Sequence, residues 1–211
     1  MSANTVIVNY NSMSHVKRVP IDGCHLHKNK GFLIYRGMIL LHIPKLTDGV
    51  IFLRPLIEED AADHLAGEDD EMAKWVSGGW STAITVEAFI RNSQESWRSG
   101  GPRRAFGVFD CVSNRLVGFI EVNLARLVEP GQVNVSYGVF RQWRGQGVAL
   151  RAINLMDEYL RTATEARQMV LRIAPANIAS LKLAEKAGFT FCGLFDEPEG
   201  RTVRYVKDIR S

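Results

Sequence analysis

The sequence has little cysteine. Its 211 residues include three, Cys24, Cys111 and Cys192, an odd number at wide spacing. This pattern indicates no disulfide framework and fits a reducing compartment such as the cytoplasm. There is no internal repeat and no low-complexity tract. We therefore expect a globular, cytoplasmic protein.

Long hydrophobic runs are also missing. The most apolar stretch, Phe32 to Ile43, has about 12 residues against the roughly 20 that span a bilayer, and it contains Arg36. It starts too far from Met1 for a signal peptide, and no small-residue cleavage site follows it. Two interpretations stay open, a strand or hairpin added to the domain, or a leader before a true start at Met38. No membrane association is expected.

An excess of one charge is absent as well. There are 26 Lys and Arg against 23 Asp and Glu, and the basic residues are spread along the chain. A net charge of +3 does not predict a nucleic-acid partner, although it mildly favours an anionic ligand. The motif Cys24-His25-Leu26-His27 has no second ligand cluster to complete a tetrahedral shell. It is interpreted as a polar surface turn, and no metal site is predicted.

The stretch from Val133 to Leu160 is typical of a strand, a glycine loop and a helix in direct succession. Apolar residues alternate with small or polar ones up to Val139, which predicts a strand with one buried face. After the polar turn Arg141 to Gly147, apolar residues recur at three- and four-residue intervals from Val148, as in an amphipathic helix. The loop thus ends at a helix N-terminus, where unpaired amides and the helix dipole favour an anion.

The glycines of this loop favour a bound phosphate. Gly145 and Gly147 have no Cβ, so successive amides can curl around phosphate oxygens, and Arg144 can add a charged donor. Two other glycine motifs are excluded. The chain contains no G-x-x-x-x-G-K-[ST], and Leu150 stands where G-x-G-x-x-G needs its third glycine.

Two motifs instead carry a family resemblance. The first, Gln142-Trp-Arg-Gly145-Gln-Gly147, followed by Ala149, fits Q-x-x-G-x-G and resembles the acetyl-CoA pyrophosphate loop of the GNAT superfamily of N-acyltransferases. The second, Asn177 to Phe189, resembles a later helix of that superfamily, N-x-x-S/A-x-x-[FLV]-x-x-K-x-G-F, whose Asn and Ser face the cofactor. Both occur in the family's order and at its usual separation.

The resemblance implies an α/β fold of the α+β type. It has a mixed, mainly antiparallel central sheet of about six or seven strands, helices on both faces, and a V-shaped opening beside Val139. The domain is expected over residues 48–211, with 1–47 as an N-terminal extension or leader. Acetyl-CoA is the implied co-substrate, a peptide or small-molecule amine the acceptor, and a monomer or homodimer the assembly. The implied cofactor-binding residues are Val139, Gln142, Arg144, Gly145, Gln146, Gly147, Val148, Ala149, Asn177 and Ser180.

The remaining elements are predicted from periodicity and turn residues. Strands are expected at residues 50–56, 105–109, 116–124, 169–174, 189–195 and 202–206, and helices at 58–66 and 85–97. Trp75 and Trp80 are the large apolar groups of a polar segment that flanks the acceptor site in GNAT enzymes. We interpret both as core anchors, with acceptor contact as the alternative.

The proton donor is where the chain departs from better-known GNAT members. Many have a tyrosine seven residues after the motif asparagine, and here that position is Ala184. The resemblance implies that a main-chain N–H near Val139 polarises the thioester carbonyl. Ser180 is a candidate acid acting through a water, or it is simply a helix serine.

The candidate base is Glu121, a carboxylate inside the apolar strand LVGFIEVNL, where burial raises the pKa. Its alternative is a solvent-facing strand position. Tyr137 and the five histidines, among them His64, are weaker candidates. No cysteine lies in a recognisable nucleophile setting, so direct transfer without a covalent enzyme intermediate is expected.

The acceptor is less defined. The opening Leu53-Arg-Pro-Leu56, the pair Ser136-Tyr137 and the helix from Asn177 most resemble the group that acetylates N-terminal amines of ribosomal and other proteins. That group has antibiotic- and polyamine-modifying relatives. We predict an N-acetyltransferase for a primary amine, first a peptide N-terminus. A protein that binds acetyl-CoA without turnover, as a sensor, is the alternative of another class.

Overall fold

The computed structural model describes residues 34–35, 38–39, 46–125, 129–198 and 200–209. The chain divides into two units, residues 1–44 and 45–211. In the first unit, the strands β1 (Ile34–Tyr35) and β2 (Met38–Ile39) pair antiparallel. The remainder of the 32–43 run and the motif at 24–27 lie outside the described residues. The domain boundary expected after residue 47 stays a prediction.

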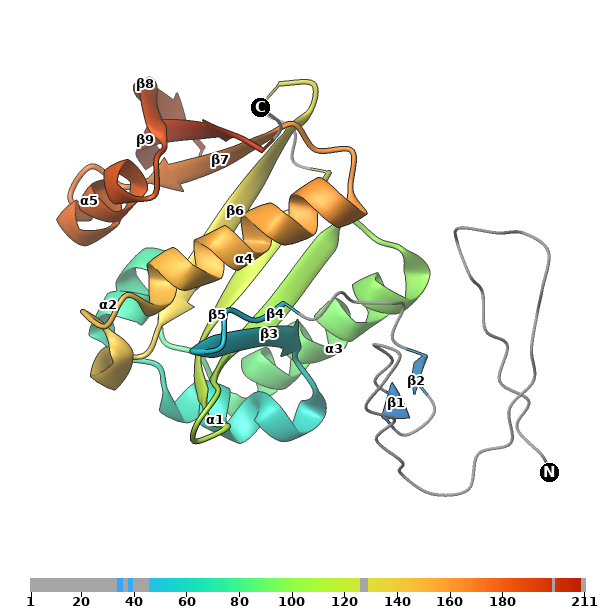
Figure 1. Ribbon diagram of the computed structural model, residues 1–211. Coiled ribbons are helices and arrows are strands. Elements are labelled where there is room, and N and C mark those ends of the chain that lie inside the picture. The colour runs from blue at the N-terminus through green and yellow to red at the C-terminus, as the bar shows by residue number, and fades with distance from the viewer. Residues whose placement is uncertain (1–33, 36–37, 40–45, 126–128, 199, 210–211) are drawn as a thin grey trace, which may run out of the picture. The chain divides into compact units, whose positions relative to one another are not determined.

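The second unit is built on a seven-stranded sheet with the order β3-β4-β5-β6-β7-β9-β8 (Figure 1). All neighbouring strands run antiparallel except β6 and β7, which confirms the predicted mixed, mainly antiparallel sheet. Each predicted strand is found to within about two residues at either end. The bounds are β3 Ile51–Pro55, β4 Arg103–Asp110, β5 Leu116–Asn123, β6 Gln132–Val139, β7 Gln168–Ile173, β8 Thr190–Glu197 and β9 Gly200–Asp208.

Helices cover both faces of this sheet. Figure 1 shows α4 (Val148–Ala163) crossing one face, where it contacts β3, β5 and β6. On the other face α1 (Ala61–Ala66), which follows the 3₁₀ turn Glu58–Asp60, contacts β5, and α3 (Ala83–Ser99) contacts β4. The last helix, α5 (Ile178–Lys186), contacts α4, β7 and β8. No helix among the described residues is long and apolar enough to cross a membrane.

The apolar stripe of α4 packs onto the sheet as its spacing predicts. Leu155 also belongs to the stripe, whereas Ala149 is only half-buried. Each fully buried large side chain contributes about 1.5–3 kcal/mol, which exceeds the differences in helix propensity along this segment. The buried residues of α4 are Val148, Ala152, Ile153, Leu155, Met156, Tyr159 and Leu160.

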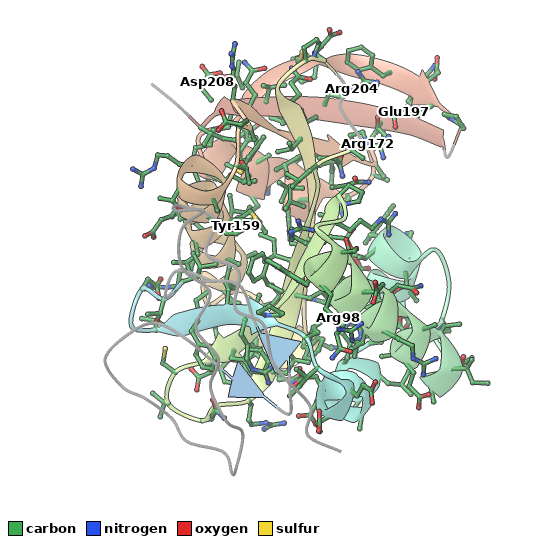
Figure 2. All side chains as sticks on the ribbon, turned by 90° about the vertical axis from the view of Figure 1, so that its right-hand side faces the viewer. Arg98, Tyr159, Arg172, Glu197, Arg204 and Asp208 are labelled. Carbon is green, nitrogen blue, oxygen red and sulfur yellow. The ribbon has the colours of Figure 1, made fainter. Side chains whose placement is uncertain are left out.

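A buried ion cluster ties together the far end of the sheet. The Glu197 carboxylate of β8 accepts hydrogen bonds from Arg172 of β7 and, at 3.0 Å, from Arg204 of β9 (Figure 2). Arg172 also donates its Nε–H to the Asn134 side chain of β6 at 3.1 Å. Four strands are therefore joined at one point, beside the end of the pairing between β6 and β7.

His64 of α1 lies among phenylalanine rings. It is 8% exposed, and its ring centroid stands 5.2 Å from that of Phe119. Neither ring nitrogen has a hydrogen-bond partner in the described part of the chain. Burial lowers the pKa of His64, and the carboxylates of Glu68 and Asp60 raise it by less. The imidazole is therefore held neutral in the folded protein.

We predict that His64→Leu stabilises the protein in acid. Unfolded histidine takes up a proton near its ordinary pKa of 6.5, whereas the buried ring does so only at lower pH, so stability falls as the pH drops below 6.5. Leucine cannot take up a proton, so the loss of stability in acid disappears, and no unpartnered ring nitrogens remain. The unfolding free energy should therefore rise by about 1 kcal/mol at pH 5.5. Urea unfolding at pH 8 and 5.5 measures the effect. An equal fall in unfolding free energy between pH 8 and 5.5 in both proteins would contradict the prediction.

Candidate active site

The parallel pairing of β6 and β7 covers only Gln132–Asn134 with Gln168–Val170. Both strands are described throughout, and no further pair joins them, so they diverge toward Val139. The Phe140 N–H donates to the Val117 carbonyl of β5 at 2.9 Å. Because such bonds alternate along an antiparallel strand, the N–H and C=O of Val139 point the other way, toward β7. The V-shaped opening therefore contains a main-chain donor where the family resemblance places one.

The loop after β6 forms a cradle of backbone amides. Gly145 and Gly147 have φ angles of 75° and 79°, in the left-handed region that favours glycine. A Cβ at either position would meet no atom within 4 Å. Gly147 is the N-cap of α4, and no side chain caps this end in the described part of the chain. Open space and uncapped amides together suit an anion.

A cavity of about 410 Å³ joins this cradle to the opening. Gln142 and Gln146 do not line it. The Gln146 side chain instead donates to the Gln142 carbonyl at 2.8 Å, which braces the loop from outside. The predicted cofactor residues that do line the cavity are Val139, Arg144, Gly145, Gly147, Val148, Ala149, Asn177 and Ser180.

Helix α5 supplies the side of the cavity that faces away from the loop. Asn177 is its N-cap, as predicted, and its side-chain oxygen accepts from the Ser180 N–H at 3.1 Å. Ser180 is half-buried and lines the cavity. Ala184, the position of the usual family tyrosine, is fully buried and does not line it. The structure thus offers no phenol on this helix.

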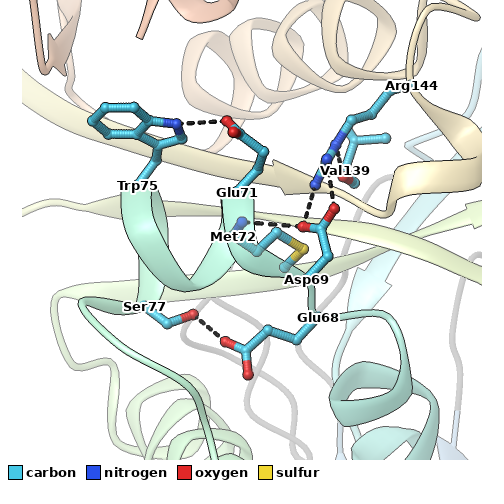
Figure 3. Close-up of polar contacts among 8 residues, drawn as sticks. All are labelled: Glu68, Asp69, Glu71, Met72, Trp75, Ser77, Val139 and Arg144. Atoms are coloured by element: carbon cyan, nitrogen blue, oxygen red, sulfur yellow. Dashed lines mark hydrogen bonds and ion pairs between the residues drawn. The ribbon is translucent and has the colours of Figure 1, made fainter. Parts of the chain in front are cut away.

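Arg144 is engaged by the protein itself (Figure 3). Its two Nη atoms each lie 2.7 Å from an oxygen of Asp69, and its Nε donates to the Val139 carbonyl at 2.8 Å. Asp69 also caps α2 (Asp70–Met72) by accepting from the Met72 N–H at 3.1 Å. Arg144 also lines the cavity, so its predicted role as a charged donor to phosphate stays a prediction. Arg144 ties the loop, the end of β6 and the start of α2 together.

The wall opposite α5 is a π-helix, Ala73–Ser77, in a segment where no helix was predicted. It places Trp75 on the cavity, with the indole N–H donating to Glu71 at 2.6 Å (Figure 3). Trp75 is half-exposed and Trp80 is 64% exposed. The interpretation of both as core anchors is therefore wrong. The four-residue spacing of Glu71 and Trp75 was the signal available in the sequence.

Glu121 is a half-buried carboxylate, as the apolar strand around it suggested. Its side chain is 14% exposed, with Arg103 Nη1 at 3.9 Å. Burial raises the pKa of Glu121, and Arg103 lowers it by less. Glu121 pairs with Ser136 across β5 and β6 and does not line the cavity. It lies on the sheet face of Phe119, two residues away, which packs against α1.

Tyr137 points to the opposite face, since neighbouring residues of a strand alternate. It lines the cavity together with Ser180. Its hydroxyl oxygen is buried and has no hydrogen-bond partner in the described part of the chain. Burial raises the pKa of the Tyr137 phenol, and the neighbouring Ser180 hydroxyl lowers it by less. Glu121 and Tyr137 therefore lie on opposite faces of the sheet, and of the two only Tyr137 lines the cavity.

Comparisons with known proteins agree with this geometry. A family model described as an acetyltransferase (GNAT) domain matches residues 51–190. A sequence comparison with curated proteins gives no significant match.

Many solved structures share the fold. A GNAT-family acetyltransferase from Bacillus anthracis is 17% identical, with a TM-score of 0.65 over 76% of this chain and 95% of that one. A putative ribosomal-protein-serine acetyltransferase from Vibrio cholerae is 16% identical, with a TM-score of 0.65 over 78% and 97%. The aminoglycoside acetyltransferase AAC(6')-Ib, in complex with coenzyme A, is 19% identical, with a TM-score of 0.63 over 75% and 94%. At these identities the likeness shows the fold alone.

We predict that the Asp69–Arg144 pair stabilises the domain measurably. Asp69→Asn removes the ion pair but keeps a capping oxygen, and it should lower the unfolding free energy by about 1 kcal/mol. Asp69→Ala also removes the cap and should lower it by about 2 kcal/mol. Arg144 lowers the pKa of Asp69 below 3.8, so the contribution is present above that pH and is lost as the pH falls through the lowered pKa. Urea unfolding at pH 7 tests the order, and equal stability of all three proteins would refute it.

Proposed function

This chain belongs to the GNAT acetyltransferase family, and we propose that it acetylates a primary amine, in the first place the N-terminal amine of a peptide or protein. It is an acyltransferase whose co-substrate is acetyl-CoA. One observation carries the proposal. The glycine cradle and the end of β6 at Val139, whose N–H points away from β5, line the same cavity.

The residues of the cavity fit acetyl-CoA. Uncapped amides at the start of α4 face the cradle, where no Cβ obstructs a pyrophosphate. Asn177 and Ser180 lie along the cavity wall that leads from the cradle to Val139. Acetyl-CoA supplies the acetyl group as a thioester. The Val139 N–H is placed to donate a hydrogen bond to the carbonyl oxygen, where charge develops during transfer.

We assign the base role to Glu121. A carboxylate with a raised pKa accepts a proton more readily than an ordinary one, and Glu121 stands on the sheet face opposite α4. An amine that reaches the opening from that face passes its proton to Glu121, directly or through a water. The base and the α4 cradle then lie on opposite sides of β6.

A single base that lies outside the cavity wall favours the N-terminal amine of a peptide as the acceptor. A peptide α-amine has a pKa near 8, so about a tenth of it is neutral at pH 7, and its deprotonation costs about 1.4 kcal/mol of free energy. For a lysine-like amine, with a pKa of about 10.4, deprotonation at pH 7 costs about 4.6 kcal/mol. Glu121 lies outside the cavity wall, beside Arg103, a position that suits an acceptor with the smaller deprotonation cost. A small-molecule acceptor is the second candidate, because AAC(6')-Ib has the same fold.

The experiment that tests the function is release of free thiol from acetyl-CoA. It is screened against peptides with free N-termini, polyamines and aminoglycosides. Turnover with peptides above all supports the proposal, and turnover with an aminoglycoside alone replaces it with the second candidate. Binding of acetyl-CoA without thiol release from any acceptor would instead indicate a sensor.

We predict that Gly147→Asp abolishes tight binding of acetyl-CoA while Gly147→Asn largely retains it. Asn and Asp both tolerate the left-handed conformation, and a Cβ at this position meets no neighbour. The two variants therefore share the same backbone strain and nearly the same bulk, and only Asp places a negative charge at the cradle. We expect about a 10-fold or greater affinity difference by calorimetry. Equal affinities would remove the cradle from the site.

We predict that Glu121→Gln slows a strongly basic acceptor about 100-fold or more and a peptide terminus only a few-fold. The wild-type kcat/KM should fall as the pH drops through the raised pKa of Glu121, and the variant should lack this limb. Glu95→Gln is the matched control, because Glu95 is an exposed residue of α3 paired with Arg98. A variant that keeps the wild-type rate and acidic limb with a basic acceptor shows that Glu121 is not the base.

A further inference from the structure

The hydroxyl of Tyr137 is a polar group of the cavity wall that the proposed function leaves unused. Its oxygen is shielded from solvent and has no hydrogen-bond partner among the described residues. Burial raises the pKa of the phenol, and the Ser180 hydroxyl lowers it by less. A buried hydroxyl without a partner is costly, so a fold under pressure for stability alone would favour phenylalanine here.

The position of Tyr137 suggests a chemical role for its buried hydroxyl. It precedes Val139, whose N–H points into the opening, by two residues on the same strand, so both lie at the V. Ser180, on the helix that carries the second family motif, faces it from α5. Both residues therefore line the cavity that the end of β6 at Val139 also lines, where the thioester would lie if its carbonyl contacts Val139. Both stand on the opposite side of β6 from Glu121.

We propose that Tyr137 is the catalytic acid that protonates the sulfur leaving group, directly or through the Ser180 hydroxyl, in place of the phenol missing at position 184. This rests on the proposed acetyl transfer. As the amine nitrogen bonds to the acetyl carbon, the carbon–sulfur bond breaks and its electron pair stays on sulfur. The phenol proton moves to that sulfur, the amine proton moves to the base, and both groups re-equilibrate with solvent. The products are the amide and the free thiol.

The protonation state suits an acid of this kind. A buried phenol with a raised pKa keeps its proton throughout the neutral range, so the proton is present when the sulfur leaves. Its hydrogen bond strengthens as negative charge gathers on sulfur, so it favours the transition state over the bound thioester. Ser180 alone has no comparable acidity, which makes it a relay rather than the source of the proton.

The test is Tyr137→Phe, which removes the hydroxyl and keeps the ring. We expect kcat to fall about 100-fold with KM for acetyl-CoA within about 2-fold, and the melting temperature to be unchanged or higher. Tyr159→Phe is the matched control. Tyr159 is a buried tyrosine of α4 that packs on Trp97 and Phe106, and its loss of a hydroxyl should leave kcat unchanged. Ser180→Ala combined with Tyr137→Phe should cost little more than Tyr137→Phe alone, because the two act in series.

A binding measurement separates this proposal from the proposed function. Calorimetry compares coenzyme A with desulfo-coenzyme A, which lacks the sulfur. The wild type should prefer coenzyme A, and Tyr137→Phe should lose that preference. A variant that keeps both the wild-type kcat and the preference overturns the proposal, as does a fall in kcat with the preference intact, which indicates a structural role. A wild type that shows the preference but releases no thiol with any acceptor contradicts the proposed function and leaves Tyr137 at the sulfur.

Discussion

The early end of the pairing between β6 and β7 is the constraint on which the rest of the molecule depends. A parallel strand pair normally continues along its length, because buried backbone groups need partners. Here the pairing stops at Asn134, and the side chain of that residue is held by Arg172 from β7. Arg172 is held in turn by the buried carboxylate of Glu197. Side-chain contacts thus hold β6 and β7 together at the point where their pairing ends, and this point forms the apex of the V-shaped opening.

The backbone groups released by this divergence are used rather than left idle. The Val139 carbonyl accepts the Arg144 Nε–H, and the Val139 N–H points to the same side of β6, away from β5. The loop that follows turns at two left-handed glycines and delivers the uncapped end of α4 to the same cavity. Under the proposed function, the recognition of an anion and of a carbonyl oxygen would come largely from main chain. Such recognition requires few particular side chains, in keeping with identities of 16–19% to three solved structures of the same fold.

The fold and the glycine loop before α4 were predictable because their signals are local. Alternation and three- to four-residue spacing give strands and helices, and the glycines announce the loop directly. The acceptor side of the site was not predictable from the sequence, because its features arise from tertiary contacts. The bond from Arg144 to Asp69 joins residues 75 apart in sequence, and no pattern near Arg144 indicates it. Trp80 is as apolar as a core residue, yet its exposure follows from the path of the chain past Gly78 and Gly79. The burial of the Tyr137 hydroxyl likewise depends on the approach of α5.

The bond between Arg144 and Asp69 also makes the two halves of the site thermodynamically dependent on each other. Arg144 belongs to the glycine loop that is proposed to bind an anion, while Asp69 begins the segment that carries Trp75. An anion that draws the guanidinium toward itself weakens its hold on Asp69 and loosens the start of α2. By linkage, a ligand that presses against Trp75 and alters that segment must change the affinity of the loop by the same factor. Under the proposed function, the affinity for each substrate would then depend on the other through a single ion pair that touches neither reacting atom.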